Sequence, residues 1–360
     1  MKILLLGEYS NVHATLARGL RELGHQVTLI SNGDFWKNYP RDIDVSRKPG
    51  RWGGISLMAR IMLLLPKMSG YDVVQLINPL FFELKAERLR PIYQYLRNHN
   101  KKIILCGFGM DWYWLNACTK FRLRYSDFNF GNQLRTDDIA MRDKKAWTNT
   151  AKVSLNKYIA QDCDAIVTGL YEYWISYHPE FPEKTVFIPF PIVVPPTYST
   201  DTASKLRLFI GISKGRSAYK GTDIMLQAAE DIVQKYPGQV ELQKAEGVSF
   251  SEYTSMMEGS DAILDQLYSY TPSMNPLEAM SKGIICIGGG EPENYEILGE
   301  TELHPIINVQ PNYDSVFHEL EQLILHPERI TLLKRQSRQY IERHHDYILV
   351  ARKYLALYEK

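Results

Sequence analysis

Short apolar runs alternate with helical patterns along this chain of 360 residues, and the alternation occurs in two successive blocks. Strands that alternate with helices form a parallel sheet that is covered by helices on both faces. In the first block the expected strands are Lys2–Leu6, Gln26–Ile30, Asp72–Ile77, Lys102–Cys106, Asp164–Thr168 and Thr185–Ile188. In the second block they are Arg207–Ile212, Val240–Lys244, Ala262–Leu267 and Ile284–Ile287. The pattern therefore predicts an α/β protein with two parallel sheets.

A proline-dense stretch, Phe187–Pro196, separates the two blocks. Proline lacks the backbone N–H that a helix or a central strand needs, so this stretch predicts a stiff crossing between two domains. We expect the first domain over residues 1–190 and the second over residues 191–335. The chain from Pro327 onward has a polar helical pattern, and residues 336–360 are expected to form a C-terminal helix that packs back on the first domain.

The composition is that of a globular protein, with 45% hydrophobic and 23% charged residues. A formal net charge of +1 provides no overall field that would attract nucleic acid. The chain shows neither the pattern of a signal peptide nor a run of ~18–20 apolar residues. Four scattered cysteines without pair spacing indicate reduced thiols rather than disulfides or zinc ligands: Cys106, Cys118, Cys163 and Cys286. We therefore expect a cytoplasmic protein.

The segment Met274–Glu293 combines a carboxylate on a helical stretch with a glycine loop. Glu278 lies in the helical part, and a short apolar run then leads to Gly288–Gly290. This order places the carboxylate and the loop at the carboxyl end of a strand, where open α/β sheets bind ligands. Glu278 is expected to hold ribose hydroxyls, with phosphates on the glycine amides. An ordinary helical glutamate is the alternative.

Two cations, Arg216 and Lys220, lie between the expected strand Arg207–Ile212 and the expected helix Gly221–Tyr236. Arg can bind phosphate with two parallel hydrogen bonds, and Lys acts as a point charge. Together with a helix N-terminus they could bind a diphosphate and stabilise the charge that develops as it leaves. The alternative is a pair of solvated loop cations.

The start of the helix that carries Glu278 is expected to contribute further donor contacts. Ser273 and Asn275 could supply side-chain contacts, and the first turn, which includes Pro276 and Leu277, could present backbone amides to the phosphates. Ser273 or Asn275 could equally be only the helix cap.

The first β-to-α turn of the chain contains Gly7, Glu8, Ser10 and His13. A short turn with a glycine lets an acceptor or a sugar phosphate approach the backbone. His13 could be a catalytic base or merely a polar residue of the first helical turn.

Three segments are similar to those of the GT-B glycosyltransferases, and most of all to the large retaining family four. The segments are KILLLGEYSNVHATLARGLRELGHQVTLIS, GISKGRSAYKGTDIMLQAAEDI and PLEAMSKGIICIGGGEPE. The resemblance implies two Rossmann-like domains that face a cleft, with the nucleotide sugar held by the second domain and the acceptor by the first. In two places the chain departs from the family pattern. Tyr270 stands where the family has a first glutamate that contacts the donor sugar. The spacing from Arg216 to Lys220 is one residue short, for which Lys214 could compensate.

The resemblance also directs attention to Asp111, which follows the strand Lys102–Cys106 and its glycine turn. At this place the family offers a polar residue to the donor sugar or the acceptor, and the alternative is a helix N-cap. Tyr270, or a neighbour such as Asn275, is expected to replace the missing carboxylate with a neutral hydrogen bond to the sugar.

The expected function is transfer of a sugar from a nucleotide-diphosphate sugar to a glycan or lipid-linked acceptor in cell-surface polysaccharide synthesis. Retention at the anomeric carbon is implied by the resemblance. No cofactor is expected besides the donor. No metal is expected either, because Asp137-Asp138 lacks the context of a phosphate loop. A sugar-nucleotide 2-epimerase of the same architecture and a non-catalytic nucleotide-sugar-binding scaffold stay open as alternatives.

The stretch Arg51–Met68 is apolar and contains only basic charges, Arg51, Arg60 and Lys67. It could lie on an anionic membrane, which would bring the protein to the inner face of the membrane and suit a lipid-linked acceptor. Its apolar residues also fit a buried core helix.

Overall fold

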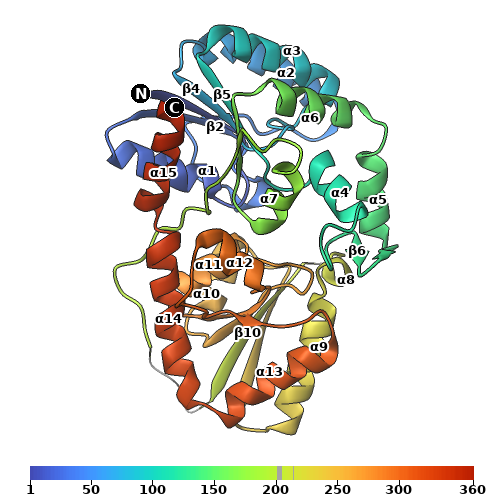
Figure 1. Cartoon of the computed structure of the whole chain (residues 1–360), viewed down its shortest axis with the longest axis vertical. Helices are drawn as coiled ribbons and strands as arrows, with labels where there is room; N and C mark the ends of the chain where they lie inside the picture. Colours follow the sequence, from blue (N-terminus) through green and yellow to red (C-terminus); the bar gives the residue numbers. More distant parts are fainter. Residues whose placement is uncertain (201–204, 214) are drawn as a thin grey trace.

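The computed structural model describes residues 1–200, 205–213 and 215–360. Figure 1 shows two α/β domains, one above the other, with both chain termini on the N-terminal domain. Lys214, which was expected to compensate for the short spacing between the two cations, lies outside the described residues.

The N-terminal domain is built on seven parallel strands in the order β3-β2-β1-β4-β5-β8-β9. Apolar residues fill both sides of this sheet, so Leu4 and Leu5, which point to opposite faces, are both fully buried. The strands are β1 (Lys2–Leu6), β2 (Gln26–Ser31), β3 (Ile43–Asp44), β4 (Val73–Leu76), β5 (Lys102–Cys106), β8 (Ala165–Thr168) and β9 (Thr185–Phe187).

Helices cover both faces of this sheet. On one face α1 packs with the C-terminal helix α15, and on the other lie α2, α3 and α6. The helical elements of this domain are α1 (Val12–Glu22), η1 (Phe35–Lys37), α2 (Gly50–Leu64), η2 (Leu65–Met68), α3 (Ala86–His99), α4 (Trp112–Thr119), α5 (Asp138–Ala146), α6 (Ala151–Asp162) and α7 (Tyr171–Tyr177). A small hairpin, β6 (Asn129–Phe130) with β7 (Gln133–Leu134), precedes α5.

The C-terminal domain has five parallel strands in the order β11-β10-β12-β13-β14. They are β10 (Leu206–Ile212), β11 (Val240–Glu246), β12 (Ala262–Leu264), β13 (Ile285–Gly288) and β14 (Ile307–Asn308). The helices of this domain are α8 (Ser217–Lys220), α9 (Thr222–Lys235), α10 (Phe250–Met257), α11 (Met274–Ser281), α12 (Pro292–Leu298), α13 (Tyr313–Leu325) and α14 (Glu328–His344), and the last helix of the chain, α15 (Tyr347–Glu359), lies on the N-terminal domain.

The direction of chain progression reverses once in each sheet, between β1 and β4 and between β10 and β12. Such a switch point leaves a crevice at the carboxyl ends of the two strands, because the following connections turn to opposite sides of the sheet. We refer to these places as the N-terminal and the C-terminal switch point.

The proline-dense crossing pairs with the joint between the last two helices. Ile192 N donates to His345 O at 2.7 Å, and Tyr347 N donates to Ile192 O at 3.1 Å. Helix α14 packs on α11 of the C-terminal domain, and α15 crosses to α1 of the N-terminal domain. The expected boundary at residue 335 therefore falls inside α14, because the chain changes domain only at His345.

Two predicted elements differ from the structure near the C-terminal switch point. The strand expected over Ala262–Leu267 ends at Leu264, and the helix expected over Gly221–Tyr236 is α9, with the short α8 before it.

Within the described residues, no helix is both long enough and apolar enough to cross a membrane. The cysteines Cys106, Cys118, Cys163 and Cys286 are buried free thiols.

Candidate functional site

The C-terminal switch point is closed by a contact between the two loops that flank it. The loop after β10 ends at Lys220, whose carbonyl oxygen accepts a hydrogen bond from Leu267 N, beyond β12, at 2.9 Å. Gly221 follows with φ +75°, and a Cβ there would lie 2.8 Å from Leu267 Cβ. Only glycine suits both the backbone conformation and the close approach. The local sequence thus brings the two cations to the reversal in the sheet.

Lys220 is half-buried and lies among charges of both signs. Burial is the largest influence that lowers its pKa, and Arg216 lowers it further, whereas Asp265 and Asp127 raise it. Arg216 itself is exposed, with its guanidinium group 5.4 Å from the ring centroid of Tyr219. An anionic ligand at this place would favour the charged form of Lys220.

Asp265 is a site residue that the sequence analysis missed. It lies directly after β12, and burial raises its pKa to about 6, while Lys220 opposes this rise. The signal was present, because a carboxylate at the end of a buried apolar run marks the carboxyl end of a strand. It was lost because the expected strand ran on to Leu267.

Glu278 lies on α11 with its side chain 41% exposed, and its ion pair with Lys282 spans 3.9 Å. Burial raises its pKa, and Lys282 lowers it. Burial raises the pKa of Tyr253, and both Asp265 and Glu278 raise it further. Asp265 also acts on Lys220, whose pKa it raises.

The start of α11 fits only part of the expectation. Ser273 occupies the N-cap position without a side-chain capping bond within the described chain, and Asn275 is half-buried. The expectations for Pro276 and Leu277 are wrong. Proline has no N–H to offer to a phosphate. Leu277 N donates to Ser273 O at 3.1 Å, and its side chain is fully buried.

The glycine loop Gly288–Gly290 does not present its amides to a ligand as expected. All three residues are buried, and Gly290 N donates to Asn308 Oδ1 at 3.0 Å. A Cβ on Gly289 would lie 2.0 Å from Ser269 O. The glycines are therefore needed for close packing beneath the segment 269–271.

The N-terminal switch point carries a buried carboxylate, Glu8. Its two oxygens accept hydrogen bonds from His13 N at 3.2 Å and Ala14 N at 2.8 Å, so Glu8 caps the start of α1. Burial raises the pKa of Glu8 to about 8 despite these amides. The carboxyl group is therefore largely neutral near pH 7.

His13 is fully buried, and both ring nitrogens are engaged. Nδ1 lies 2.8 Å from Gly7 O, and Nε2 lies 3.1 Å from Gln75 Nε2. Nδ1 therefore carries the proton, and Nε2 accepts from the amide of Gln75. Gln75 Oε1 accepts from Tyr358 OH at 2.7 Å, which links the turn to α15. Burial lowers the pKa of His13 to about 4. The ring positions the turn, and its burial speaks against the role of a base.

A cavity of about 270 Å³ opens at the N-terminal switch point. This volume is close to the lower end of the range for ligand pockets, about 300–1,000 Å³. Its lining is mainly apolar, with a few polar groups. The lining residues include Gly7, Glu8, Tyr9, Asn32, Phe35, Val45, Ile77, Leu80, Phe81, Phe82, Glu83, Leu84 and Lys152. Ser10 lies outside this lining, where its hydroxyl accepts from Lys37 Nζ at 3.1 Å.

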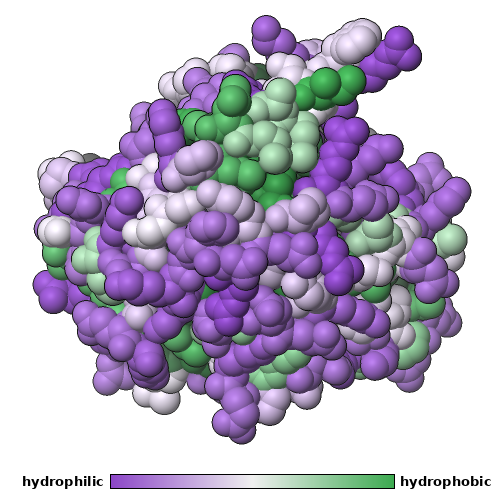
Figure 2. Space-filling view, turned by 90° about the horizontal axis from the view of Figure 1, so that it is seen from above, coloured by the Kyte–Doolittle hydropathy of each residue, from purple (hydrophilic) through white to green (hydrophobic). Residues whose placement is uncertain are grey.

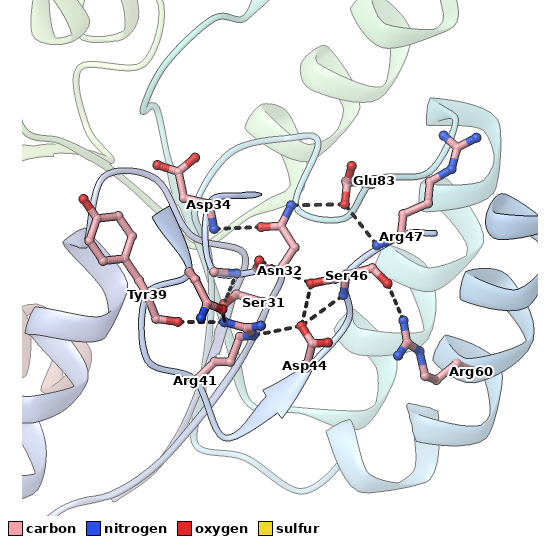
Figure 3. A network of polar contacts seen from close by, with 12 residues as sticks. Ser31, Asn32, Asp34, Tyr39, Arg41, Asp44, Ser46, Arg47, Arg60 and Glu83 are labelled. Carbon is pink, nitrogen blue, oxygen red and sulfur yellow. Dashed lines mark hydrogen bonds and ion pairs between the residues drawn. The ribbon is translucent and has the colours of Figure 1, made fainter. Parts of the chain in front are cut away.

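A polar network holds the rim of this cavity (Figure 3). Asn32 Nδ2 donates to Glu83 Oε2 at 3.1 Å, and the same carboxylate oxygen accepts from Arg47 N at 3.3 Å. Asn32 Oδ1 also accepts from Asp34 N at 3.1 Å. The rim is therefore set by side chains from the ends of β2 and β4 and by the loop before α2.

Asp111 is buried as the N-cap of α4. Its Oδ1 accepts from Trp114 N at 2.8 Å, and its Oδ2 accepts from Tyr177 OH at 2.5 Å. Burial raises the pKa of Asp111 to about 6. Both oxygens are used within the N-terminal domain, so the structure favours the capping alternative over a contact with the donor sugar or the acceptor.

Residues 121–147 form a bridging segment that reaches from the N-terminal domain onto the C-terminal domain beside α8 (Figure 1). Arg135 donates to Tyr219 O at 2.9 Å and to Ala218 O at 2.8 Å. Arg124 forms ion pairs with Glu291 and Glu293 at 2.7 Å each. These contacts connect the two domains on the side opposite α14 and α15.

Tyr270, at the position of the expected glutamate, is covered by the bridging segment. Its side chain is almost fully buried, and its hydroxyl accepts from Arg124 N at 2.7 Å. Tyr171 stacks on the ring with a centroid distance of 5.8 Å. In this structure Tyr270 anchors the bridging segment, and it does not present an open hydrogen-bonding group to a donor sugar.

A buried carboxylate from the other domain holds the same stretch of chain. Glu172 of α7 accepts from Tyr270 N at 2.6 Å and from Thr271 N at 3.0 Å.

The expectation of a metal-free site remains a prediction. In the part of the chain that the structure describes, no three His, Cys, Asp or Glu side chains are grouped as metal ligands would be.

Comparison with known proteins gives structural matches only. No family model and no curated protein sequence matches the chain. Sucrose-phosphate synthase from Thermosynechococcus elongatus matches over 100% of this chain and 98% of its own, with a TM-score of 0.64 and 12% identity. HepE of Anabaena, solved with UDP and glucose, matches over 100% of both chains, with a TM-score of 0.61 and 11% identity.

A glycosyltransferase from Rickettsia africae matches over 99% of this chain and 97% of its own, with a TM-score of 0.56 and 11% identity. These matches extend over both domains and the crossing between them. The chain has the GT-B fold. At this level of identity, the site residues of this GT-B protein have to be judged from its own geometry.

Proposed function

We propose that this protein transfers a sugar from a nucleotide-diphosphate sugar to an acceptor. One observation carries the proposal. The C-terminal domain carries Lys220 and Arg216 in the connection at its switch point and the half-exposed carboxylate of Glu278 on α11, while the N-terminal switch point offers a mainly apolar cavity. The first arrangement suits a diphosphate and a ribose, and the second suits an uncharged acceptor group.

In the proposed reaction the bond between the anomeric carbon and the diphosphate oxygen breaks, and its electron pair leaves with the diphosphate. A hydroxyl oxygen of the acceptor forms the new bond with the anomeric carbon, and its proton goes to the leaving diphosphate. Lys220 and Arg216 stabilise the charge that grows on the diphosphate. Glu278 accepts hydrogen bonds from the ribose hydroxyls. Because two cations fill this role, the proposal includes no metal ion. Separately, we propose retention of configuration at the anomeric carbon, on the family resemblance alone.

The acceptor that we propose is a glycan or a lipid-linked glycan in the assembly of a cell-surface polysaccharide. The lining of the cavity supports this choice, since apolar residues surround the polar groups of Glu8, Asn32 and Glu83. Sugar rings present both apolar faces and hydroxyl groups, so such a mixed lining suits them.

A panel of nucleoside diphosphates and nucleotide sugars tests the donor site by thermal shift. UDP and UDP-glucose come first, because the HepE structures contain them. A ligand that binds only the folded protein raises the melting temperature by mass action. Consumption of the stabilising donor, with and without an acceptor pool from a cell extract, then tests the transfer. If no nucleotide raises the melting temperature, the proposed function is wrong.

A scaffold that binds nucleotide sugars without turnover is the second candidate. The covered position of Tyr270 favours it, because the donor sugar lacks the carboxylate expected there. Tyr270→Glu separates the two candidates in the same assay. Consumption of donor by the variant and none by the parent would support the scaffold, whereas acceptor-dependent consumption by the parent would exclude it.

A further inference from the structure

Helix α2 is apolar on its buried side and also on its exposed side. The buried side contributes Leu57 and Ile61 to the core. On the opposite side, large apolar residues are strongly exposed: Trp52 70%, Ile55 51%, Met62 49% and Leu63 80%. Their positions, successively three, seven and one residue apart, place them along one face of the helix. The expectation of a core helix thus accounts for only half of α2.

The exposed apolar side chains form one patch rather than scattered contacts. Seen from above the N-terminal domain, apolar residues gather in a raised patch at one edge, with hydrophilic residues around it (Figure 2). Exposed Ala59 and Pro66 extend the stripe between and beyond the large residues. A contiguous apolar patch on a protein surface marks a site of contact with a partner or a membrane.

The stretch of chain that carries this patch contains charges of one sign only. Between Val45 and Tyr71 the sequence contains five cations and no Asp or Glu. All five are exposed: Arg47, Lys48, Arg51, Arg60 and Lys67. This contrasts with the whole chain, in which 42 Lys and Arg balance 41 Asp and Glu. An apolar stripe on a segment whose own charged residues are all cations is complementary to an anionic lipid surface.

Helix α2 is fixed to the rim of the N-terminal cavity (Figure 3). Arg60 donates to Ser46 O at 2.6 Å, and the next residue, Arg47, donates its backbone N–H to Glu83. Glu83 and Val45 both line the cavity. A surface that binds α2 would therefore lie near the cavity, because hydrogen bonds through Ser46 and Arg47 connect α2 to the cavity rim.

We propose that the exposed face of α2 docks the protein on an anionic phospholipid bilayer. Trp52, Ile55, Met62 and Leu63 enter the headgroup region, and the flanking cations bind lipid phosphates. The docking itself is independent of the proposed transfer. That the docked cavity receives an acceptor at the membrane surface rests on the proposed function.

Co-sedimentation of the full chain with vesicles tests this docking. Vesicles of phosphatidylcholine with added phosphatidylglycerol are compared with vesicles of phosphatidylcholine alone. The parent should sediment with the anionic vesicles and lose binding as salt is raised. Arg51→Ala and Lys67→Ala should each lower the partition coefficient roughly fivefold. The double variant Trp52→Ser/Leu63→Ser should bind to neither kind of vesicle.

Leu332→Ser is the matched control, because Leu332 is 57% exposed on α14, far along the chain from α2. It should sediment like the parent. Equal melting temperatures and equal nucleotide shifts for all variants would show that the fold and the donor site are intact, so a failure of docking is distinct from a failure of the proposed function.

Three results would overturn the docking proposal. The parent could sediment equally with neutral and anionic vesicles or with neither, or the double variant could bind like the parent. Light scattering could also show a dimer of the parent that the double variant abolishes without any vesicle binding, in which case a second copy of the chain covers α2.

Discussion

The two switch points lie at equivalent places in two similar sheets, yet the ionisable groups near them differ in their charge state. At the N-terminal switch point a buried carboxyl group, Glu8, and a buried imidazole, His13, are both held near their neutral forms. At the C-terminal switch point the groups are partly exposed, and Lys220 and Arg216 lie close to the carboxylates of Asp265 and Asp127. Burial thus holds Glu8 and His13 near their neutral forms at one switch point, whereas cations and carboxylates act on one another at the other.

The difference arises from which side chains follow the first strand of each domain. After β1, Glu8 folds back onto the start of α1, where its backbone donors satisfy it, and burial then keeps it uncharged. After β10, the loop runs outward through Arg216 before α8 returns it to Lys220. A neutral site suits an acceptor hydroxyl, and a cationic site suits a diphosphate. The predictions below test this division, and those on nucleotide affinity are given in order of decreasing expected effect.

Removal of Lys220 should have the largest effect. Lys220→Ala is expected to weaken UDP binding by about 1.5–3 kcal/mol, roughly 10- to 150-fold, because a charge-assisted contact is lost. Arg216→Ala should act in the same direction but less strongly, since Arg216 is more exposed. Titration calorimetry measures both. Lys205→Ala is the control, because Lys205 pairs with Glu241 on the surface of the same domain. Unchanged UDP affinity in both site variants would show that Lys220 and Arg216 do not bind the diphosphate.

Glu278→Gln should reduce affinity for UDP by about 1–2 kcal/mol, because a neutral amide is a weaker acceptor for the ribose hydroxyls. The loss should be smaller for 2′-deoxy-UDP, which lacks one of these hydroxyls. Glu258→Gln is a close control, since Glu258 also pairs with Lys282, at 3.6 Å. If the parent binds the ribose and the deoxyribose nucleotide equally well, Glu278 is an ordinary helical residue.

The neutral state of Glu8 should appear in the pH dependence of stability. Its pKa is raised from 4.5 to about 8 in the folded protein, so its contribution to stability is fully present below pH 4.5 and is lost as pH rises toward 8. The loss is up to about 1.4 kcal/mol per pH unit in that range. Urea unfolding of the parent and Glu8→Gln between pH 5 and pH 8 isolates this contribution. If the free energies of unfolding of the parent and the variant differ by the same amount at every pH in this range, Glu8 is ionised when buried.

Asp127→Asn should give the smallest effect, and in the opposite direction to the other site variants. Asp127 belongs to the bridging segment, and Arg216, Arg135 and Lys220 all lower its pKa against the larger effect of burial. Its carboxylate competes with a diphosphate for the same cations. The variant should bind UDP about fivefold more tightly, which corresponds to about 1 kcal/mol. Asp138→Asn, on an exposed residue of the same segment, should leave the affinity unchanged, and weaker binding by Asp127→Asn would contradict the competition.

Local pattern was sufficient for most of the two sheets. The strands Lys2–Leu6 and Lys102–Cys106 have the predicted bounds, because buried parallel strands are short apolar runs that end in turns. The cations between β10 and α9 could also be located, since strand, loop and helix follow one another directly in the sequence. Gly221 supports the same turn by its conformation alone.

The roles that the sequence left open were decided by contacts between distant residues. His13 and Asp111 had the composition of catalytic groups, but Gln75 lies 62 positions from His13, and Tyr177 lies 66 positions from Asp111. Their burial became apparent only when these partners packed against them. The glycine loop likewise looked like a phosphate loop until Ser269 was found against Gly289.

What the sequence determined by itself was the order of the longer strands, the crossing, and the position of the cation loop, because each depends on residues close together in the chain; the short strands β3 and β14 were not predicted. The tertiary structure alone decided that the bridging segment covers Tyr270 and that α15 returns to α1. It also left one side of α2 uncovered. Burial sets the pKa values and the accessibility of side chains, and burial depends on neighbours that lie far away in sequence.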